Sequence, residues 1–138
     1  MDYEHLADTR RIQEYVTNMR PAFNKRAVFS DETENYRTPA EPEPGDVVNI
    51  RIRTKSNNVD FVYLVAGNLR QRMKLLDTKD GFDYYGTDIK LGAQSIRYFF
   101  EVISGKIQCY YNKMGITKEI DEHYSFGIVP GFHTPEWA

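Results

Sequence analysis

The chain has 138 residues, which is enough for one compact domain with its own core. Hydrophobic residues make up 41% of it and aromatic residues 14%, a composition that excludes a disordered chain. No apolar run approaches the roughly 18 residues that span a membrane, and the net charge of −2 argues against a nucleic-acid partner, which needs a positive excess.

The first 20 residues have the pattern of a helix, which Pro21 ends because proline disfavours the helical conformation in the residue before it. The apolar stripe of this helix is formed by Ile12, Tyr15, Val16 and Met19. Two roles stay open for the helix: it packs on its own domain, or it contacts a partner subunit or another domain. We therefore divide the chain into a helical extension at 1–25, a β domain at 26–132 and a terminal segment at 133–138.

Beyond the Pro-rich loop at 39–45, the hydrophobic period changes from helical to two. In the segment 95–104, four alternate residues are expected to face the core, while Arg97 and Glu101 face outward. Cys109 lies in the apolar run IQCYY, which favours a buried structural thiol over a nucleophile. The core-facing residues are Ile96, Tyr98, Phe100 and Val102.

About eight short strands with turns between them predict an antiparallel β-sandwich with an N-terminal helix. No helical pattern alternates with the strands, which excludes a parallel α/β sheet. The expected strands are 27–30, 46–54, 59–67, 71–78, 82–91, 95–104, 106–112 and 124–129.

The last residues, FGIVPGFHTPEWA (126–138), resemble the junction between the N-terminal domain and the catalytic barrel in neopullulanases, cyclomaltodextrinases and maltogenic amylases. In those enzymes a Pro-Glu/Asp-Trp segment leads into the first barrel strand, and here it is Pro135-Glu136-Trp137. Other segments resemble the family in order and spacing: AVFS, VNIRIRT, NVDFVYLVAG, FDYY, IRYFFEV and YYNKMGIT. The resemblance covers 27–138 and implies an immunoglobulin-like sandwich, classed as a family 34 carbohydrate-binding module.

This resemblance implies a non-catalytic accessory domain, cut off before the barrel of a retaining hydrolase that cleaves α-glucans such as starch, maltooligosaccharides, cyclodextrins or pullulan. The catalytic carboxylates of that family lie on the barrel, so we expect no catalytic residue here. The acidic pairs Asp31-Glu32 and Asp121-Glu122 are interpreted as charged turn residues. The three histidines lack metal-ligand spacing, so no metal or cofactor is predicted. No signal peptide is visible, so the expected location is the bacterial cytoplasm, and secretion of the parent stays open.

Aromatic side chains that point away from the core are candidates for glucan contact, because sugar rings stack on aromatic faces. The candidates are Tyr36, Tyr63, and one of Tyr84 or Tyr85, since adjacent strand residues face opposite ways. The alternative for each tyrosine is packing with its hydroxyl at the surface.

In dimeric relatives the loop after the second family strand narrows the partner's active site, and here that loop is 66–74. It carries Leu69, Arg70 and Arg72 where some relatives have an aromatic residue, so we expect contacts within a homodimer or a solvated loop. Trp137 is interpreted as a packing residue at the domain junction, with a sugar platform as the alternative. A different class of function also stays open: a free-standing β-sandwich that is either a protein-interaction domain or a regulatory domain that binds glycan.

Overall fold

The computed structural model describes residues 22–132. The helix predicted at 1–20 and the junction residue Trp137 therefore lie outside the described residues. Within the described part, no helix is long and apolar enough to cross a membrane.

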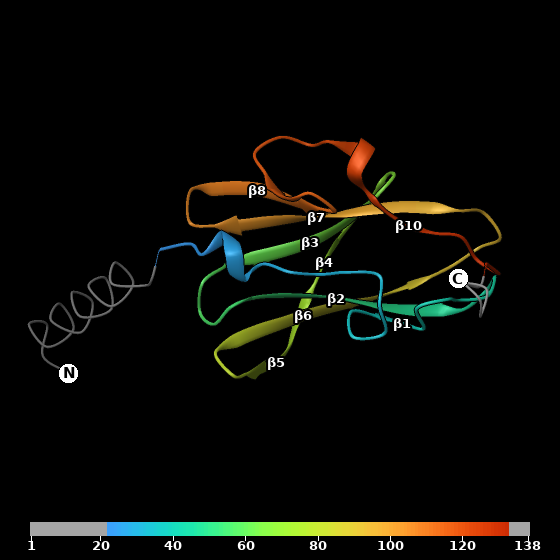
Figure 1. Ribbon diagram of the computed structural model, residues 1–138, viewed down its shortest axis with the longest axis horizontal. Helices are drawn as coiled ribbons and strands as arrows, with labels where there is room; N and C mark the ends of the chain where they lie inside the picture. Colours follow the sequence, from blue (N-terminus) through green and yellow to red (C-terminus); the bar gives the residue numbers. More distant parts are fainter. Residues whose placement is uncertain (1–21, 133–138) are drawn as a thin grey trace, which may run out of the picture.

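The described residues form ten strands in two antiparallel sheets that face each other (Figure 1). The four-stranded sheet has the order β1 (Arg37–Thr38), β2 (Val47–Lys55), β6 (Phe82–Lys90), β5 (Lys74–Lys79). The other sheet has the order β4 (Leu69–Arg72), β3 (Phe61–Ala66), β7 (Ile96–Ser104), β8 (Ile107–Asn112), β9 (Gly115–Thr117), and β10 (Phe126–Ile128) pairs with the first part of β7. Two short 3₁₀ helices, η1 (Lys25–Ala27) and η2 (Glu122–Tyr124), lie between strands or before them. The all-β sandwich predicted from the sequence is confirmed.

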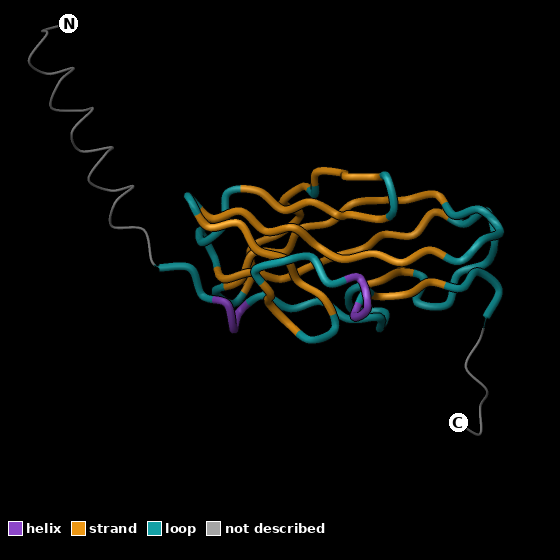
Figure 2. The backbone as a smooth tube through the Cα atoms, turned by 90° about the horizontal axis from the view of Figure 1, so that it is seen from above, coloured by secondary structure: helices purple, strands orange, loops and turns teal. Residues whose placement is uncertain are grey.

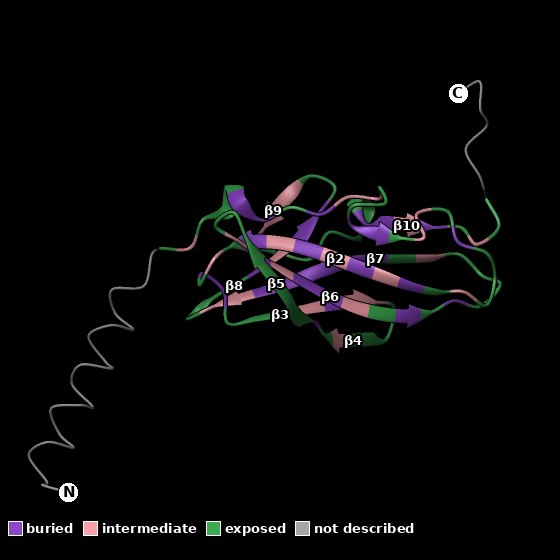
Figure 3. Ribbon diagram, turned by 90° about the horizontal axis from the view of Figure 1, so that it is seen from below, coloured by how far each residue is buried: buried purple, intermediate pink, exposed green. Residues whose placement is uncertain are grey.

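The strands form where the hydrophobic period is two. In β2, Val48, Ile50 and Ile52 are fully buried, while the residues between them are partly exposed. The burial colours therefore alternate along this strand (Figure 3). This pattern places one face of each sheet on the core and the other toward solvent.

The core between the sheets is centred on aromatic side chains from three strands. The ring of Phe126 stacks on Tyr98 at 5.3 Å and on Tyr111 at 6.1 Å, and Phe100 packs edge-on against Phe126 at 5.9 Å. Cys109 is buried beside them and its thiol faces the carbonyl of Val102 at 3.7 Å, as expected for a structural thiol. Each fully buried aromatic side chain stabilises the fold by roughly 1.5–3 kcal/mol relative to an exposed one.

The predicted first strand at 27–30 is wrong in extent. Ala27 ends η1, and Phe29 alone pairs with Arg53 in an isolated bridge. The chain turns away from the sheet immediately afterward, because the carboxylate of Asp31 accepts the backbone N–H of Thr33. It returns as β1, a two-residue strand that the sequence pattern did not predict.

The segment 66–78 also differs from the prediction of a loop followed by one strand. Gly67, in the left-handed region at φ +58°, and Asn68 make a tight turn, so β3 and β4 form a hairpin. The chain then passes through the buried residue Met73 and enters the other sheet as β5. One residue thus separates strands of the two sheets.

A buried arginine fastens the loop before β2 to the last strand. Arg37 is 7% exposed; its Nη1 donates to the carbonyl of Gly127 at 2.9 Å and pairs with Glu32 at 3.2 Å. Its Nη2 donates to the carbonyl of Ala40 at 2.9 Å. Glu32, predicted as a charged turn residue, therefore lies in an ion cluster, which Lys113 completes at 3.2 Å. We use the name Arg37 cluster for this group of contacts, which is made up of Arg37, Glu32, Lys113 and the carbonyl groups of Ala40 and Gly127.

The chain enters the sandwich at Ala22 and leaves it at Phe132, and these two points lie at opposite ends of the long axis (Figures 1 and 2). The entry is fixed by Asn58, whose side chain bonds to the backbone of Ala22 and Asn24. The exit is fixed by the N–H of Gly131, which donates to the carbonyl of Pro42 at 2.8 Å.

Candidate functional site

The outer face of the four-stranded sheet gathers aromatic and cationic side chains from segments far apart in the sequence. The register of β2 and β6 places Arg53 opposite Tyr84 and Lys55 opposite Phe82, and the bridge to Arg53 adds Phe29 at the other edge. We call this surface the β2–β6 face. Its members all come from positions that alternate with core residues, which is why they point to solvent.

Arg53 is the centre of the β2–β6 face. Its guanidinium lies 4.4 Å from the ring centroid of Phe82 and 5.5 Å from that of Phe29, both within the range of cation–π attraction. Its Nε donates to the carbonyl of Ala27 at 3.1 Å, which fixes the plane of the guanidinium. The result is a stack of ring, cation and ring whose outer edges remain open to solvent, since Phe29 is 37% exposed.

Two of the predicted glucan contacts, Tyr36 and Tyr84, meet on this side of the molecule. Tyr84 is half-buried on the β2–β6 face, as an outward-facing residue should be. Tyr36 is 9% exposed, because the turn at 31–36 folds it against the ring of Phe29 at 5.2 Å. Burial raises the pKa of Tyr36, and the nearby charge of Arg53 opposes that shift. The prediction that Tyr36 is an exposed platform is therefore wrong. The ring of Tyr36 instead packs edge-on against the ring of Phe29.

Tyr85 faces the opposite way from Tyr84 and belongs to the core between the sheets. The expectation that the two residues face opposite sides is confirmed, and of the two only Tyr84 remains a candidate platform. Gly86 follows on the outer face, where the side chain of Leu76 covers it. Leu76 sits there because β5 has a bulge between Leu75 and Asp77.

Tyr63 lies on the outer face of the other sheet, and a cation covers its ring. The guanidinium of Arg70 stands 3.7 Å above the ring centroid, and its Nε donates to Glu101 Oε1 at 2.9 Å. A second contact joins Arg70 Nη2 to the same carboxylate oxygen, and Gln108 donates to the other oxygen at 3.0 Å. The hydrogen bonds that Arg70 donates to Glu101 raise the pKa of the Arg70 guanidinium. The covered face of Tyr63 is thus not available for stacking on a sugar.

Glu101 faces away from the core as predicted, but its side chain is almost completely covered by this pairing. The second cation of the predicted loop, Arg72, lies 4.8 Å above the ring of Phe61. Leu69 is exposed at the end of the hairpin that carries both arginines. The interface candidates Leu69, Arg70 and Arg72 therefore share one edge strand, β4, whereas Trp137 lies outside the described residues.

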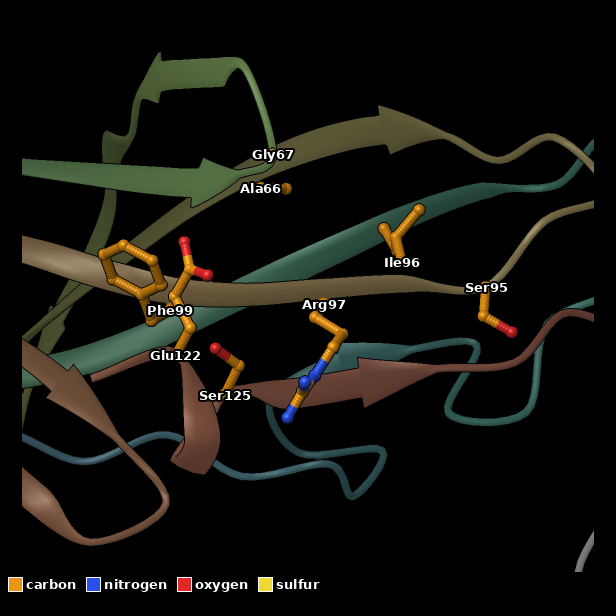
Figure 4. Close-up of a pocket in the computed structure, with 8 residues that line it drawn as sticks. All are labelled: Ala66, Gly67, Ser95, Ile96, Arg97, Phe99, Glu122 and Ser125. Atoms are coloured by element: carbon orange, nitrogen blue, oxygen red, sulfur yellow. The ribbon is translucent and has the colours of Figure 1, made fainter. Parts of the chain in front are cut away.

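A cavity of about 310 Å³ opens on the six-stranded sheet near the turn after β3 (Figure 4). The ring of Phe99 lines it, and the polar side chains around it are those of Ser95, Arg97, Glu122 and Ser125. Of the site candidates named individually, none of those in the described part of the chain lines this cavity, but Ala66 and Gly67 of the predicted loop 66–74 do. The described residues also contain no group of three or more His, Cys, Asp or Glu side chains that could hold a metal ion.

Sequence reasoning missed Phe29, Arg53 and Phe82 as members of a site. A signal was present for the last two: both occupy outward positions of strongly alternating strands. For Phe29 no such signal exists, because a single bridge places it.

Residues 23–130 match the family model described as "Alpha amylase, N-terminal ig-like domain". Among curated proteins, the cyclomaltodextrinase of Thermoanaerobacter pseudethanolicus is 29% identical over 119 residues, covering 80% of this chain and 20% of that protein. The cyclomaltodextrinase of Geobacillus thermopakistaniensis is 28% identical over 133 residues, covering 83% of this chain and 22% of that protein. The chain thus spans about a fifth of the length of these relatives.

Solved structures share the fold. A cyclomaltodextrinase superposes with a TM-score of 0.65 at 22% identity over 81% of this chain and 21% of that one. The maltogenic amylase from S. marinus gives a TM-score of 0.61 at 14% identity, covering 80% of this chain and 16% of that one. The type III pullulan hydrolase from Thermococcus kodakarensis gives 0.52 at 20% identity, covering 80% and 18%.

Proposed function

Because this chain belongs to the family of α-amylase N-terminal Ig-like domains, we propose that it is the accessory domain of a larger hydrolase that acts on α-glucans. The family match over 23–130 is the observation that carries the proposal. The length of the relatives supports a catalytic barrel downstream of this domain, in the same polypeptide. The domain itself then serves binding and assembly, and cleavage of the glucosidic bond takes place on the barrel. The similarity to these longer enzymes favours an accessory domain over a free-standing interaction domain.

The β2–β6 face is the part of the domain that we assign to glucan contact. The guanidinium of Arg53 lies over one face of Phe82 and of Phe29, so these rings present their edges to a ligand, and Tyr84 adds its own ring beside them. A glucose ring is apolar on its two faces and polar around its rim, so it needs an aromatic surface with hydrogen-bond donors next to it. The arrangement supplies both without rearrangement, which lowers the entropic cost of binding.

Isothermal titration calorimetry of the 138-residue chain with maltoheptaose and with β-cyclodextrin tests this assignment. Tyr84→Ala and Phe82→Ala should each weaken binding about tenfold, which corresponds to roughly 1.4 kcal/mol. Tyr63→Ala is the matched control, because Tyr63 lies in the other sheet and is not part of the β2–β6 face. Absence of heat at millimolar ligand, or equal losses in all three variants, would exclude the β2–β6 face as the glucan site.

The β3–β4 hairpin is the part that we assign to contact with a second copy and to shaping of its active site. It ends in the exposed Leu69, and β4 is an edge strand with an unpaired side within the described sheet. Its arginines are held rigidly on Tyr63 and Phe61, so the hairpin presents one fixed surface. In the longer protein, Leu69→Asp should shift a dimer toward monomer in sedimentation, and Leu76→Asp on the opposite sheet should not. An unchanged dimer would exclude this role.

A further inference from the structure

Three successive outward positions of β2 carry a positive charge: Arg51, Arg53 and Lys55. Among the described residues, none of the three forms an ion pair with a carboxylate. Acidic side chains outnumber basic ones in the chain as a whole, which has a net charge of −2. The cations of this row nevertheless have no direct ion-pair partner among the described residues.

The hydrogen bonds of these cations go to neutral groups. Arg51 Nη2 donates to the carbonyl of Glu34 at 2.8 Å and to the hydroxyl of Thr38 at 2.6 Å. Its Nε is buried and, within the part of the chain that the structure describes, has no acceptor. Arg53 donates only through Nε to a carbonyl, which leaves its Nη groups without a protein acceptor among the described residues. Both guanidiniums are thus held in place while their charge stays uncompensated.

The neighbouring strands increase the positive character of the face. By register, Lys74 lies opposite Gly86 and Lys79 opposite Phe82, on the same side as the β2 cations. In the strands of this sheet, the outward carboxylates are Asp77, opposite Tyr84, and Asp88, which accepts a hydrogen bond from Asn49 at 2.9 Å; Asp31 and Glu34 lie in the turn beside β1. Cationic side chains therefore dominate the sheet surface on which Phe82 and Tyr84 lie.

We propose that the β2–β6 face binds α-glucan that carries phosphate monoesters, with the phosphate on Arg53 and Lys55 and the adjoining glucose ring on Phe82 and Tyr84. The proposal rests on the glucan contact proposed above and names the chemical form of the ligand. A phosphate monoester is close to a dianion at neutral pH and offers three acceptor oxygens, which matches cations that lack an acidic partner. A neutral glucan has no anionic group that could form an ion pair with the cations of β2.

Single-stranded nucleic acid, such as RNA, also combines phosphates with stacking rings. The formal net charge of −2 disfavours it, because the long-range field of the whole chain repels a polyanion. A glucan with isolated phosphate groups needs only a local positive surface. RNA therefore becomes one outcome of the test.

The test compares three ligands on the 138-residue chain by calorimetry: maltoheptaose, maltoheptaose phosphorylated at a C6 hydroxyl, and a uridine heptanucleotide. At low ionic strength the phosphorylated glucan should bind about tenfold more tightly than the neutral one, because each surface ion pair contributes a factor of about 1.5 to 5. Raising the salt concentration to about 0.3 M should remove most of this difference, because exposed charges are screened. The affinity for neutral maltoheptaose should not change.

Lys55→Gln should reduce the ratio of the affinity for the phosphorylated glucan to that for neutral maltoheptaose about threefold. Lys106→Gln is the matched control, because Lys106 is an exposed lysine in the turn between β7 and β8 of the other sheet. Equal affinity for the two glucans would overturn this inference and leave the proposed glucan contact intact. Binding of neither glucan would remove the proposed contact as well. Tighter binding of the uridine oligomer than of the phosphorylated glucan would assign the face to nucleic acid instead.

Discussion

Replacing Arg37 by alanine tests whether the Arg37 cluster holds the loop before β2 on the last strand. The truncation leaves the carbonyl oxygens of Ala40 and Gly127 without their donor inside the protein. It also removes the ion pair with Glu32, whose side chain is 35% exposed.

The size of the loss follows from these contacts. The loss of each hydrogen bond to a carbonyl lowers the free energy of unfolding by about 1 kcal/mol. The ion pair adds about 1 kcal/mol, the upper end of the range for a pair that water partly screens. The contact to the Tyr98 hydroxyl, at 3.4 Å, is too long to add much. Arg37→Ala should therefore lower the free energy of unfolding by about 3 kcal/mol.

Urea denaturation followed by far-ultraviolet circular dichroism measures this change. Arg97→Ala is the control, because Arg97 is exposed and makes one long hydrogen bond, to the carbonyl of His123 at 3.3 Å; it should cost less than about 0.5 kcal/mol. A double-mutant cycle with Glu32→Ala should give a coupling energy of about 1 kcal/mol. A loss below about 1 kcal/mol for Arg37→Ala, or zero coupling, would refute this account of the cluster.

Two further predictions concern buried titratable groups. Burial raises the pKa of Tyr98 to about 12, against about 10 in an unfolded chain, so the unfolded state loses its proton first as the pH rises. The contribution of Tyr98 is complete below pH about 10 and declines as the pH approaches about 12, and Tyr98→Phe should flatten the fall in the free energy of unfolding between these values. An identical slope in the variant, measured by urea denaturation at several pH values, would contradict this. Burial also raises the pKa of the Cys109 thiol, so native protein at pH 8 should react with a disulfide reagent at least 100-fold more slowly than protein in urea, since only the exposed thiolate is a nucleophile. Rapid stoichiometric labelling of the native chain would show that the thiol is accessible.

The sequence predicted the sandwich because its main strands alternate so regularly. In β2 and β7 the inward positions are apolar, and the structure buries the inward residues Val48, Ile50, Tyr98 and Phe100 completely. Such a period depends only on the geometry of a single strand, so it can be read without knowing the strand's partner.

The parts that the sequence did not predict depend on long-range pairing. β2 pairs with β6 and not with β3, which follows it in the chain, so the meeting of Arg53 with Tyr84 and Phe82 has no local signal. The sequence also carries no local signal for the passage from one sheet to the other at Met73, because that passage depends on which distant strands β4 and β5 pair with. The position of Tyr36 beside the Pro-rich loop predicts a residue that points to solvent, yet a turn held by Asp31 folds it inward.

The described chain enters and leaves the sandwich at opposite ends, so its two attachment points stand a full sheet length apart. The β2–β6 face lies along the side of the domain between these two points. The sandwich therefore has the geometry of a spacer, in addition to offering a surface of its own.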